Sequence, residues 1–225
     1  REVTLIDRAT VPLSRALGTV AGELVGELHR ENGVELRTRR SVQSVDRKAG
    51  DRSGPAGPAR ITLDDGSGLD ADLVIAAVGS APNVEWLRGS GLDLRDGVGC
   101  DELGQAAPGV YAIGDVARWG ATDGAGVRVE HRTNATEQAL AVAQHILHGT
   151  RAPAAIPYFW TDQFGERIQV AGYIPAGAHT DVTVGDLSSR RFVLTATQGG
   201  VLTGVVAWRM AKDFTRHRAH LAGVG

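Results

Sequence analysis

The chain of 225 residues contains one cysteine, Cys100. A disulfide within the chain and a redox centre built from paired cysteines are therefore excluded. Long hydrophobic runs are also missing. No stretch approaches the ~18 apolar residues that a membrane-spanning helix needs, and no secretory signal opens the chain. From these absences we expect a cytoplasmic protein that does not contact a membrane.

Neither sign of charge is in large excess. The chain has 24 lysines and arginines against 26 aspartates and glutamates, so no global electrostatic field attracts it to nucleic acid. A metal site is not expected either. His145 and His148 lie three residues apart on a predicted helix, but no carboxylate or thiol joins them at a usable spacing.

The first residues lack a glycine-rich turn. The chain begins without methionine and enters the apolar run Val3–Ile6 at once, with no Gly-x-Gly-x-x-Gly sequence in front of it. That run ends in Asp7 and is typical of a buried parallel strand. Apolar residues then recur at helical spacing until Asn32-Gly33, and a second strand follows. The front of the chain is therefore predicted as a β-α-β unit.

The stretch from Gly109 to Trp119 carries the clearest functional signal. Its short apolar strand, Val110–Ile113, runs directly into Gly114-Asp115. In an open α/β sheet, ligands bind beyond the carboxyl ends of the strands. Gly114 has no Cβ that would collide with a ligand, and the Asp115 carboxylate can accept a hydrogen bond from a sugar-like hydroxyl. The alternative is that Gly-Asp only begins a turn after a buried strand.

The clearest helix is predicted from Ala135 to His148. Asn134 is its expected N-cap, with Glu137 three residues later as the second member of a capping pair, and Gly149 ends the helix. Its buried stripe is predicted to comprise Ala139, Val142, Ala143, Ile146 and Leu147.

The remaining pattern predicts strands. Residues 41–64 indicate a β-hairpin with a long Gly- and Pro-rich tip, residues 48–58, expected to be a mobile surface loop. Leu73–Val78 is a continuous apolar run, as expected for a strand that is covered on both faces. After the linker 151–157, period-two strands and a final helix predict a small α+β domain with an antiparallel sheet.

Three segments, in this order, resemble the flavoprotein reductases that have two dinucleotide-binding domains. Residues 109–119 resemble their second flavin-binding motif, and Val74–Asn83 resembles the exit from their NAD domain. Tyr158–Gln163 and Ile168–Gly172 are similar to the C-terminal domain of ferredoxin, rubredoxin and putidaredoxin reductases. The chain thus resembles members of the pyridine nucleotide-disulfide oxidoreductase superfamily.

This resemblance implies a fold class and a division into domains. The fold is α/β, with a partial Rossmann-like fold of the FAD/NAD(P) type followed by a small α+β domain. Residues 1–79 would be the C-terminal part of the NAD-binding domain, and residues 80–150 the returning part of the FAD-binding domain. Residues 151–225 would be the reductase C-terminal domain. Both phosphate-binding glycine loops of the family precede this part, so we expect a C-terminal piece of a longer reductase, inactive by itself.

The resemblance also implies a nucleotide site for NAD(P)H. Asp7 ends the second strand of a mononucleotide-binding unit, where a carboxylate accepts the ribose hydroxyls and repels a 2′-phosphate, so NADH is the preferred nucleotide. Arg8 and Arg15 leave a preference for NADPH open, because a guanidinium can pair with the 2′-phosphate. In the family, the position matching Arg15 contacts the dinucleotide, and the glycine matching Gly79 packs against it. Asp7 and Gly79 could also be plain strand-end residues.

On the flavin side, the resemblance implies that Asp115 binds the ribityl chain of FAD directly after Gly114. The helix near Asn134 would direct its N-terminus at the flavin pyrimidine ring, where free N–H groups stabilise the negative charge of the reduced flavin. The cofactor performs the hydride step in this class, so no catalytic acid or base is expected.

The segment that leads into this helix adds three candidates, and the later segment Tyr158–Gln163 adds a fourth. Glu130 is a candidate nicotinamide contact, or equally a solvated surface acid. Arg132 stands where many relatives carry an aromatic or apolar residue, and Thr133 follows it in the same segment. Relatives place the tryptophan matching Trp160 near the flavin edge that faces the iron–sulfur partner; core packing is the alternative.

The implied function is that of an FAD-dependent oxidoreductase which passes electrons from NADH to a ferredoxin- or rubredoxin-like iron–sulfur protein of an oxygenase system. Basic residues near the C-terminus could steer such an acidic partner, or only form a solvated surface; they are Arg190, Arg191, Arg209, Lys212, Arg216 and Arg218. The alternatives are an NADH oxidase or disulfide-reductase type of flavoenzyme, and an inactive remnant or interaction module.

Overall fold

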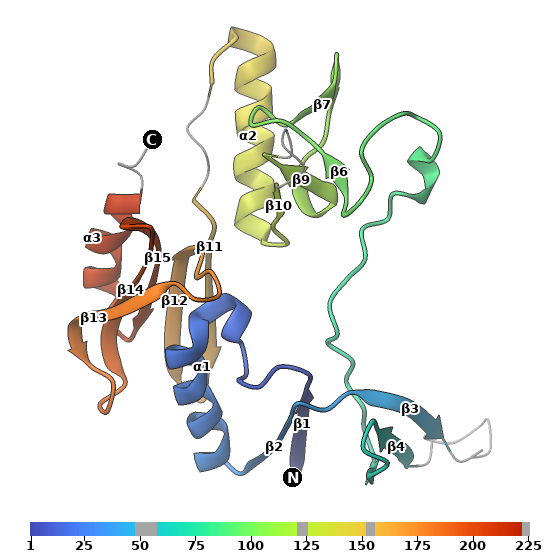
Figure 1. Cartoon of the computed structure of the whole chain (residues 1–225), viewed down its shortest axis with the longest axis vertical. Helices are drawn as coiled ribbons and strands as arrows, with labels where there is room; N and C mark the ends of the chain where they lie inside the picture. The colour runs from blue at the N-terminus through green and yellow to red at the C-terminus, as the bar shows by residue number, and fades with distance from the viewer. Residues whose placement is uncertain (48–57, 121–125, 152–155, 222–225) are drawn as a thin grey trace. The chain divides into compact units, whose positions relative to one another are not determined.

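A computed structural model describes residues 1–47, 58–120, 126–151 and 156–221 (Figure 1). The chain divides into two compact units. The first comprises residues 1–78 with the short segments 163–165 and 174–178, and the second comprises the remaining residues from 79 onward. The division lies next to the predicted boundary between residues 79 and 80, but the second unit includes both of the later predicted domains except for residues 163–165 and 174–178. The division into three domains stays a prediction.

The first unit opens with the predicted β-α-β unit. Strands β1 (Val3–Asp7) and β2 (Val34–Thr38) pair in parallel, with Asp7 opposite Thr38, and helix α1 (Ser14–Glu31) connects them. The helix is amphipathic, and its fully buried apolar residues recur at helical spacing; they are Leu17, Ala21, Val25 and Leu28. The expectation of a buried β1 is wrong, since Val3 is 52% exposed. Within the described residues, β1 pairs with β2 alone.

A three-stranded antiparallel sheet follows in the same unit. It consists of β3 (Val42–Arg47), β4 (Ala59–Leu63) and β5 (Gly68–Ala71), in that order. Alternate residues of β4, namely Ala59, Ile61 and Leu63, form its buried core. The predicted hairpin is therefore confirmed. Its tip lies outside the described residues except for Pro58.

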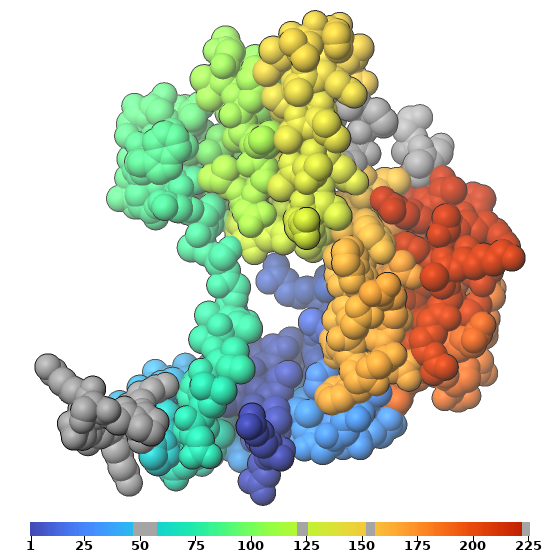
Figure 2. All heavy atoms as spheres, turned by 180° about the vertical axis from the view of Figure 1, so that it is seen from behind, coloured from blue at the N-terminus to red at the C-terminus, as the bar shows by residue number. Residues whose placement is uncertain are grey.

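The predicted strand Leu73–Val78 does not form. The segment is extended without strand pairing, and Leu73, Ile75 and Val78 are 71%, 81% and 86% exposed. Figure 2 shows it as a narrow teal column of spheres. A buried parallel strand needs a paired neighbour and a covering layer. Among the described residues, no strand pairs with this segment, and of its own residues Val74 alone packs against the buried core of β4. Apolar composition alone therefore does not produce a strand.

The second unit begins with small elements around the Gly114-Asp115 segment. In chain order they are η1 (Glu85–Leu87), β6 (Val98–Gly99), β7 (Gln105–Ala107), β8 (Val110–Tyr111), η2 (Gly114–Val116), β9 (Ala117–Trp119) and β10 (Val127–Arg128). Strands β6, β9 and β10 form one sheet in the order β10-β9-β6, in which β6 and β9 are parallel. Strand β8 is two residues shorter than predicted, and it pairs with β7.

Helix α2 (Arg132–His148) begins three residues earlier than predicted, with His131 at the N-cap position. The expected N-cap, Asn134, lies inside the helix and is buried, and its amide donates a hydrogen bond to the carbonyl oxygen of Val129 at 3.2 Å. A buried amide needs such a partner, which explains why this side chain does not cap the helix. The predicted end is confirmed, because Gly149 adopts a left-handed conformation there.

The buried face of α2 also differs from the prediction. Ile146 and Leu147 are 59% and 73% exposed, and the buried positions are Asn134, Gln138 and Val142, four residues apart. Two of these three are polar. The prediction is confirmed for Val142, whereas Ala143, Ile146 and Leu147 are exposed, so apolar spacing identifies only one position of the buried face.

The C-terminal part of the second unit forms a five-stranded sheet and a helix. The elements are β11 (Tyr158–Gln163), β12 (Glu166–Gly172), β13 (His179–Asp186), β14 (Arg191–Gln198), β15 (Val201–Trp208) and α3 (Ala211–Leu221). The strand order is β11-β12-β15-β14-β13, and β12 to β15 pair antiparallel. Phe214 of α3 is buried against a cluster on the sheet made of Ala171, Val193, Val205 and Ala207. The predicted α+β domain is confirmed.

The fold class predicted from the sequence is thus confirmed as α/β with a small α+β C-terminal part. Among the helices that the structure describes, none combines the length and the apolar character that crossing a membrane requires.

Candidate functional site

The Gly114-Asp115 turn is attached to helix α2 by a buried hydrogen bond. The backbone N–H of Gly114 donates to Oε1 of Gln138 at 2.8 Å, and Gln138 is 4% exposed. Gly114 has a positive φ of 73°, and a Cβ built there would lie 3.5 Å from the Cβ of Ala135 on the helix. The turn therefore lies against the first part of α2, and Asp115 itself is exposed.

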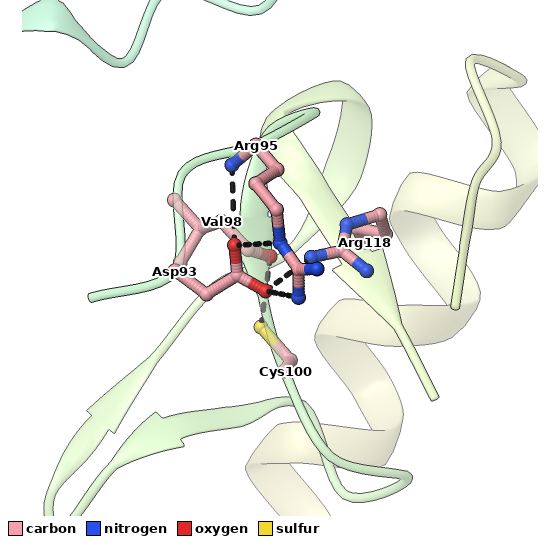
Figure 3. Close-up of polar contacts among 5 residues, drawn as sticks. All are labelled: Asp93, Arg95, Val98, Cys100 and Arg118. Atoms are coloured by element: carbon pink, nitrogen blue, oxygen red, sulfur yellow. Dashed lines mark hydrogen bonds and ion pairs between the residues drawn. The ribbon is translucent and has the colours of Figure 1, made fainter. Parts of the chain in front are cut away.

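An ion cluster joins the segment before β6 to β9, the strand that follows this turn (Figure 3). Asp93 precedes β6, and its carboxylate accepts hydrogen bonds from Arg95 and from Arg118 on β9. Arg118 is 4% exposed, so its charge requires a partner. The side chain and backbone N–H of Arg95, together with Arg118, hold the pKa of Asp93 far below its usual range. Within the described residues, β9 follows η2 directly, so the cluster fixes the strand that carries the turn.

Close backbone packing accompanies the ion cluster. Gly97 has a φ of 83°, and a Cβ at this position would overlap the carbonyl oxygen of Val116 in η2. Only glycine is compatible with both the conformation and the contact. The chain segment before β6 therefore packs directly on the turn that contains Asp115.

Cys100 has a packing role at the same place. It is 3% exposed, and its thiol donates to the carbonyl oxygen of Val98 at 3.4 Å. Burial raises the pKa of Cys100 to about 11. The side chain is therefore a protonated thiol at neutral pH, which is neither nucleophilic nor a metal ligand. Among the residues that the structure describes, no group of three or more His, Cys, Asp or Glu side chains could hold a metal ion.

A pocket of about 640 Å³ opens between the N-terminus of α2 and strand β11. This volume is within the range of small-molecule sites. It is lined by Glu130, His131, Arg132, Thr133, Thr136, Glu137, Tyr158, Phe159 and Trp160. The first turn of α2 contains no acidic residue. Its free N–H groups and the aromatic side chains of β11 together suit a planar ligand with anionic character.

Contacts between α2 and β11 determine the shape of this pocket. The hydroxyl of Thr133 donates to the carbonyl oxygen of Tyr158 at 3.1 Å. The rings of His131 and Phe159 lie 4.9 Å apart, and those of Tyr158 and Trp160 lie 5.7 Å apart. Trp160 is nevertheless 49% exposed, which disfavours the alternative that it only fills a core.

His131 connects the pocket with Asp115 electrostatically. Burial lowers its pKa, while the negative charges of Asp115 and Glu130 act in the opposite direction. Its Nδ1 is buried and has no hydrogen-bond partner among the described residues. Asp115 does not line the pocket, but its negative charge acts on His131, which does.

Glu130 is engaged in the structure and not freely solvated. Its carboxylate accepts hydrogen bonds from Ser80 and from Arg128, and both contacts lower its pKa. Arg128 also donates to the carbonyl oxygen of Asp115 at 3.1 Å. Ser80 directly follows Gly79, so Glu130 links the predicted Gly79 position to the pocket. Gly79 is exposed, with a φ of 89°.

The structure therefore groups the predicted site residues unevenly. The pocket wall contains four of them, namely Glu130, Arg132, Thr133 and Trp160. Gly114, which precedes Asp115, is bonded to Gln138 of α2, the helix whose first residues line the pocket. Gly79 precedes Ser80, which donates to the pocket residue Glu130. Asp7 and Arg15 belong to the first compact unit. There Asp7 is half-buried and accepts a hydrogen bond from the N–H of Ala9 at 2.9 Å, and Arg15 is exposed in the first turn of α1.

Sequence reasoning missed several contributors to the site, among them Gln138, Tyr158 and Phe159. Gln138 was overlooked because it is polar, although its spacing of four residues from Asn134 and Val142 marks one face of the helix. Tyr158 and Phe159 were considered only as part of a family segment. Their place in the pocket depends on contact with α2, which no local pattern reveals.

The predicted basic surface near the C-terminus is partly neutralised. Arg209 pairs with Glu166, Arg216 contacts Asp213 at 3.4 Å, and Arg218 lies over the ring of Tyr158 at 4.8 Å. Its role in docking an acidic partner stays a prediction.

Comparison with known proteins identifies two matching families. Residues 1–139 match "Pyridine nucleotide-disulphide oxidoreductase", and residues 158–223 match "Reductase C-terminal". The resemblance inferred from the sequence is thereby confirmed.

Individual relatives match nearly the whole chain. Rhodocoxin reductase of Rhodococcus erythropolis is 30% identical over 98% of this chain and 51% of its own length. The ferredoxin–NAD(+) reductase subunit of the benzene 1,2-dioxygenase system of Pseudomonas putida is 32% identical over 94% of this chain and 50% of its own length. The chain spans about half the length of these curated relatives.

A solved structure matches the fold. In the crystal structure of a covalent putidaredoxin reductase–putidaredoxin complex, the matching chain is 30% identical with a TM-score of 0.86. The match covers 99% of this chain and 52% of the other.

The hydrogen bond between Gln138 and Gly114 can be removed with little change in shape. In the variant Gln138→Leu, the buried N–H of Gly114 loses its acceptor, and we expect a loss of roughly 1–3 kcal/mol in the free energy of unfolding. Urea unfolding measures this loss, and amide exchange at Gly114 should become faster. The matched control is Gln144→Leu, at an exposed position of the same helix. Equal stability of the two variants would contradict the importance of this bond.

The ion cluster gives a pH-dependent prediction. Because the pKa of Asp93 is lowered in the folded state, its stabilisation is present above the unfolded pKa of about 4 and is lost as the pH falls further. Asp93→Asn should therefore lower the urea midpoint at pH 7, and the gap to the parent should narrow toward pH 3. Glu85→Gln, at an exposed position, should change little at either pH. A gap that is independent of pH would speak against the ion pair as its cause.

Proposed function

The chain belongs to the pyridine nucleotide-disulphide oxidoreductase family, and on this premise we propose that the protein is an FAD-dependent oxidoreductase. It passes electrons from NADH to a ferredoxin- or rubredoxin-like iron–sulfur protein of an oxygenase system. The observation that carries the proposal is the joint placement of the Asp115 turn and the pocket at the N-terminus of α2, which the Gln138–Gly114 hydrogen bond holds together.

The names of the relatives support the choice of donor and acceptor. One is a ferredoxin–NAD(+) reductase subunit of a dioxygenase system, and the structural match comes from a complex of a reductase with putidaredoxin. By analogy, a small iron–sulfur protein is the electron acceptor here, and the cytoplasm is the compartment. Lys212 and Arg218 of α3, which pair with no acid among the described residues, would favour an acidic partner.

The residues present fit a flavin. Gly114 allows the backbone to approach a ligand, and the exposed carboxylate of Asp115 can accept a hydrogen bond from a ribityl hydroxyl. The N-terminal N–H groups of α2 and the hydroxyl-bearing Thr133 lie at the pocket, beside Trp160. FAD supplies hydride acceptance and single-electron release when it is bound.

The chain's own residues would tune that cofactor. Arg132 stands in the first turn of α2, where the helix dipole already concentrates positive charge and a cation is unfavourable. A guanidinium in that place adds to the stabilisation of negative charge in the pocket. Glu130 keeps its negative charge because Ser80 and Arg128 hold it, and it serves as a contact for the nicotinamide.

We assign the nucleotide-binding role to the first unit. Asp7 ends β1 at the edge of a parallel pair and can accept a hydrogen bond from the adenosine ribose, which favours NADH over NADPH. Arg15 contacts the dinucleotide, and Gly79 lies where residues 1–79, of the NAD domain, lead into residues 80–150, of the FAD domain. Residues 151–225 form the reductase C-terminal domain.

Spectroscopy and a coupled assay test the function. Protein expressed from the complete gene should show flavin absorbance and reduce a ferredoxin with NADH, whereas residues 1–225 alone should be colourless and inactive. The control acceptor is ferricyanide, which accepts electrons without docking. Flavin that is reduced by NADH but passes no electrons to any ferredoxin or rubredoxin would refute the proposed acceptor, and absence of flavin would refute the proposal as a whole.

The role of Asp115 has its own test. In the flavin-containing protein, Asp115→Ala removes a charged hydrogen-bond acceptor, and we expect about tenfold weaker retention of FAD. Released flavin after dilution, followed by fluorescence, measures it. Asp72→Ala removes an exposed acid outside the pocket and should leave retention unchanged. Full retention in Asp115→Ala would rule out the assigned contact.

A further inference from the structure

Arg39 adopts a backbone conformation that side chains disfavour. It directly follows β2 and has a φ of 56°, in the left-handed region where glycine is the favoured residue. Strand β2 pairs in parallel with β1, and Thr38, the residue before Arg39, lies opposite Asp7. A strained residue at the edge of a predicted nucleotide site points to a use for its side chain.

Hydrogen bonds connect Arg39 to the loop that begins with Asp7. The backbone N–H of Arg39 donates to the carbonyl oxygen of Ala9 at 3.1 Å, and its Nε donates to the hydroxyl of Thr10 at 3.3 Å. The N–H of Arg40 donates to the carbonyl oxygen of Asp7 at 3.1 Å. These contacts place the guanidinium of Arg39 against the same short loop that carries the Asp7 carboxylate.

The outer nitrogens of this guanidinium are available. Arg37 pairs with Glu35 at 2.9 Å, and Arg40 pairs with Asp65 at 2.6 Å. Arg39 is exposed, and among the described residues no carboxylate pairs with it. Of the three arginines at this end of β2, Arg39 is thus the one that can offer a charged pair of N–H donors to a ligand.

We propose that Arg39 is a specificity-determining residue that contacts the 2′-phosphate of NADPH, so that the site accepts NADPH as a second choice beside NADH. This inference rests on the proposed function, because it takes the end of β1 as the adenosine site. A guanidinium binds phosphate through two parallel hydrogen bonds, and it offsets the repulsion by Asp7.

Two other arginines are less suited to this contact. Arg8 and Arg15 are exposed, and within the part of the chain that the structure describes, no side-chain hydrogen bond fixes the direction of either guanidinium. Arg39 is anchored through Nε to Thr10, so less side-chain freedom is lost when it binds a phosphate. Anchoring therefore distinguishes Arg39 from its neighbours.

Steady-state kinetics on protein from the complete gene test the assignment. Arg39→Gln should lower kcat/KM for NADPH by about tenfold, the cost of losing a charged hydrogen bond, and change the value for NADH by less than about twofold. Arg39→Lys should retain part of the NADPH activity. Arg39→Gly relieves the backbone strain and should still be defective with NADPH. Arg30→Gln removes an equal charge from an exposed position in the last turn of α1, and as the matched control it should change the value for either nucleotide by less than about twofold.

A binding measurement gives a readout that is independent of turnover. Titration calorimetry should show that Arg39→Gln weakens the binding of adenosine 2′,5′-bisphosphate by about the same factor and leaves the affinity for 5′-AMP unchanged. Equal losses for both nucleotides, or full recovery in Arg39→Gly, would reveal a merely structural role and overturn the inference. No loss for either nucleotide would also overturn it. Failure of the parent protein to oxidise NADH would instead refute the proposed function. The titration with adenosine 2′,5′-bisphosphate would still test whether Arg39 binds the 2′-phosphate.

Discussion

The hydrogen bond from the Gly114 N–H to Gln138 is the contact on which the candidate site depends. It joins a turn, which follows a two-residue strand, to a helix that begins seventeen positions later in the chain, counted from Asp115 to Arg132. Without it, Asp115 would lie at the end of an element too short to be rigid. Because Gln138 is buried, the bond has no competing water, and its loss would leave a buried N–H without a partner.

The second constraint on the turn is the ion pair between Asp93 and Arg118, which lies on β9 directly after the turn. The buried guanidinium of Arg118 pairs with the carboxylate of Asp93, and this ion pair holds the segment before β6 against β9. Gly97 then allows the backbone to touch η2. The three strands of this sheet are only two or three residues long, and an ion pair and a close backbone contact add to the small core that they bury.

Patterns that depend on neighbours in sequence were predicted well. The β-α-β unit and the C-terminal sheet follow from local spacing, because amphipathic periodicity records which face each element buries. The strand predicted at Leu73–Val78 does not form. Its apolar sequence is typical of a strand buried on both faces, but Leu73, Ile75 and Val78 are exposed in the described part of the chain. The cap of α2 was misplaced because Asn134 satisfies its amide with Val129, inside the helix, and the sequence cannot show where a buried amide finds its partner.

By itself, the sequence determined the family and the fold class, and it predicts which residue types stand at the proposed flavin and nucleotide positions, because short motifs such as Gly114-Asp115 depend on local backbone requirements and hydrogen-bonding chemistry. The tertiary structure alone decided that Glu130, Arg132, Thr133 and Trp160 share one pocket, that Gln138 supports Asp115, and that Arg39 is anchored beside Asp7. These relations join residues distant in sequence. They arise from packing and from the pairing of buried polar groups, which depend on the whole fold and not on any one segment.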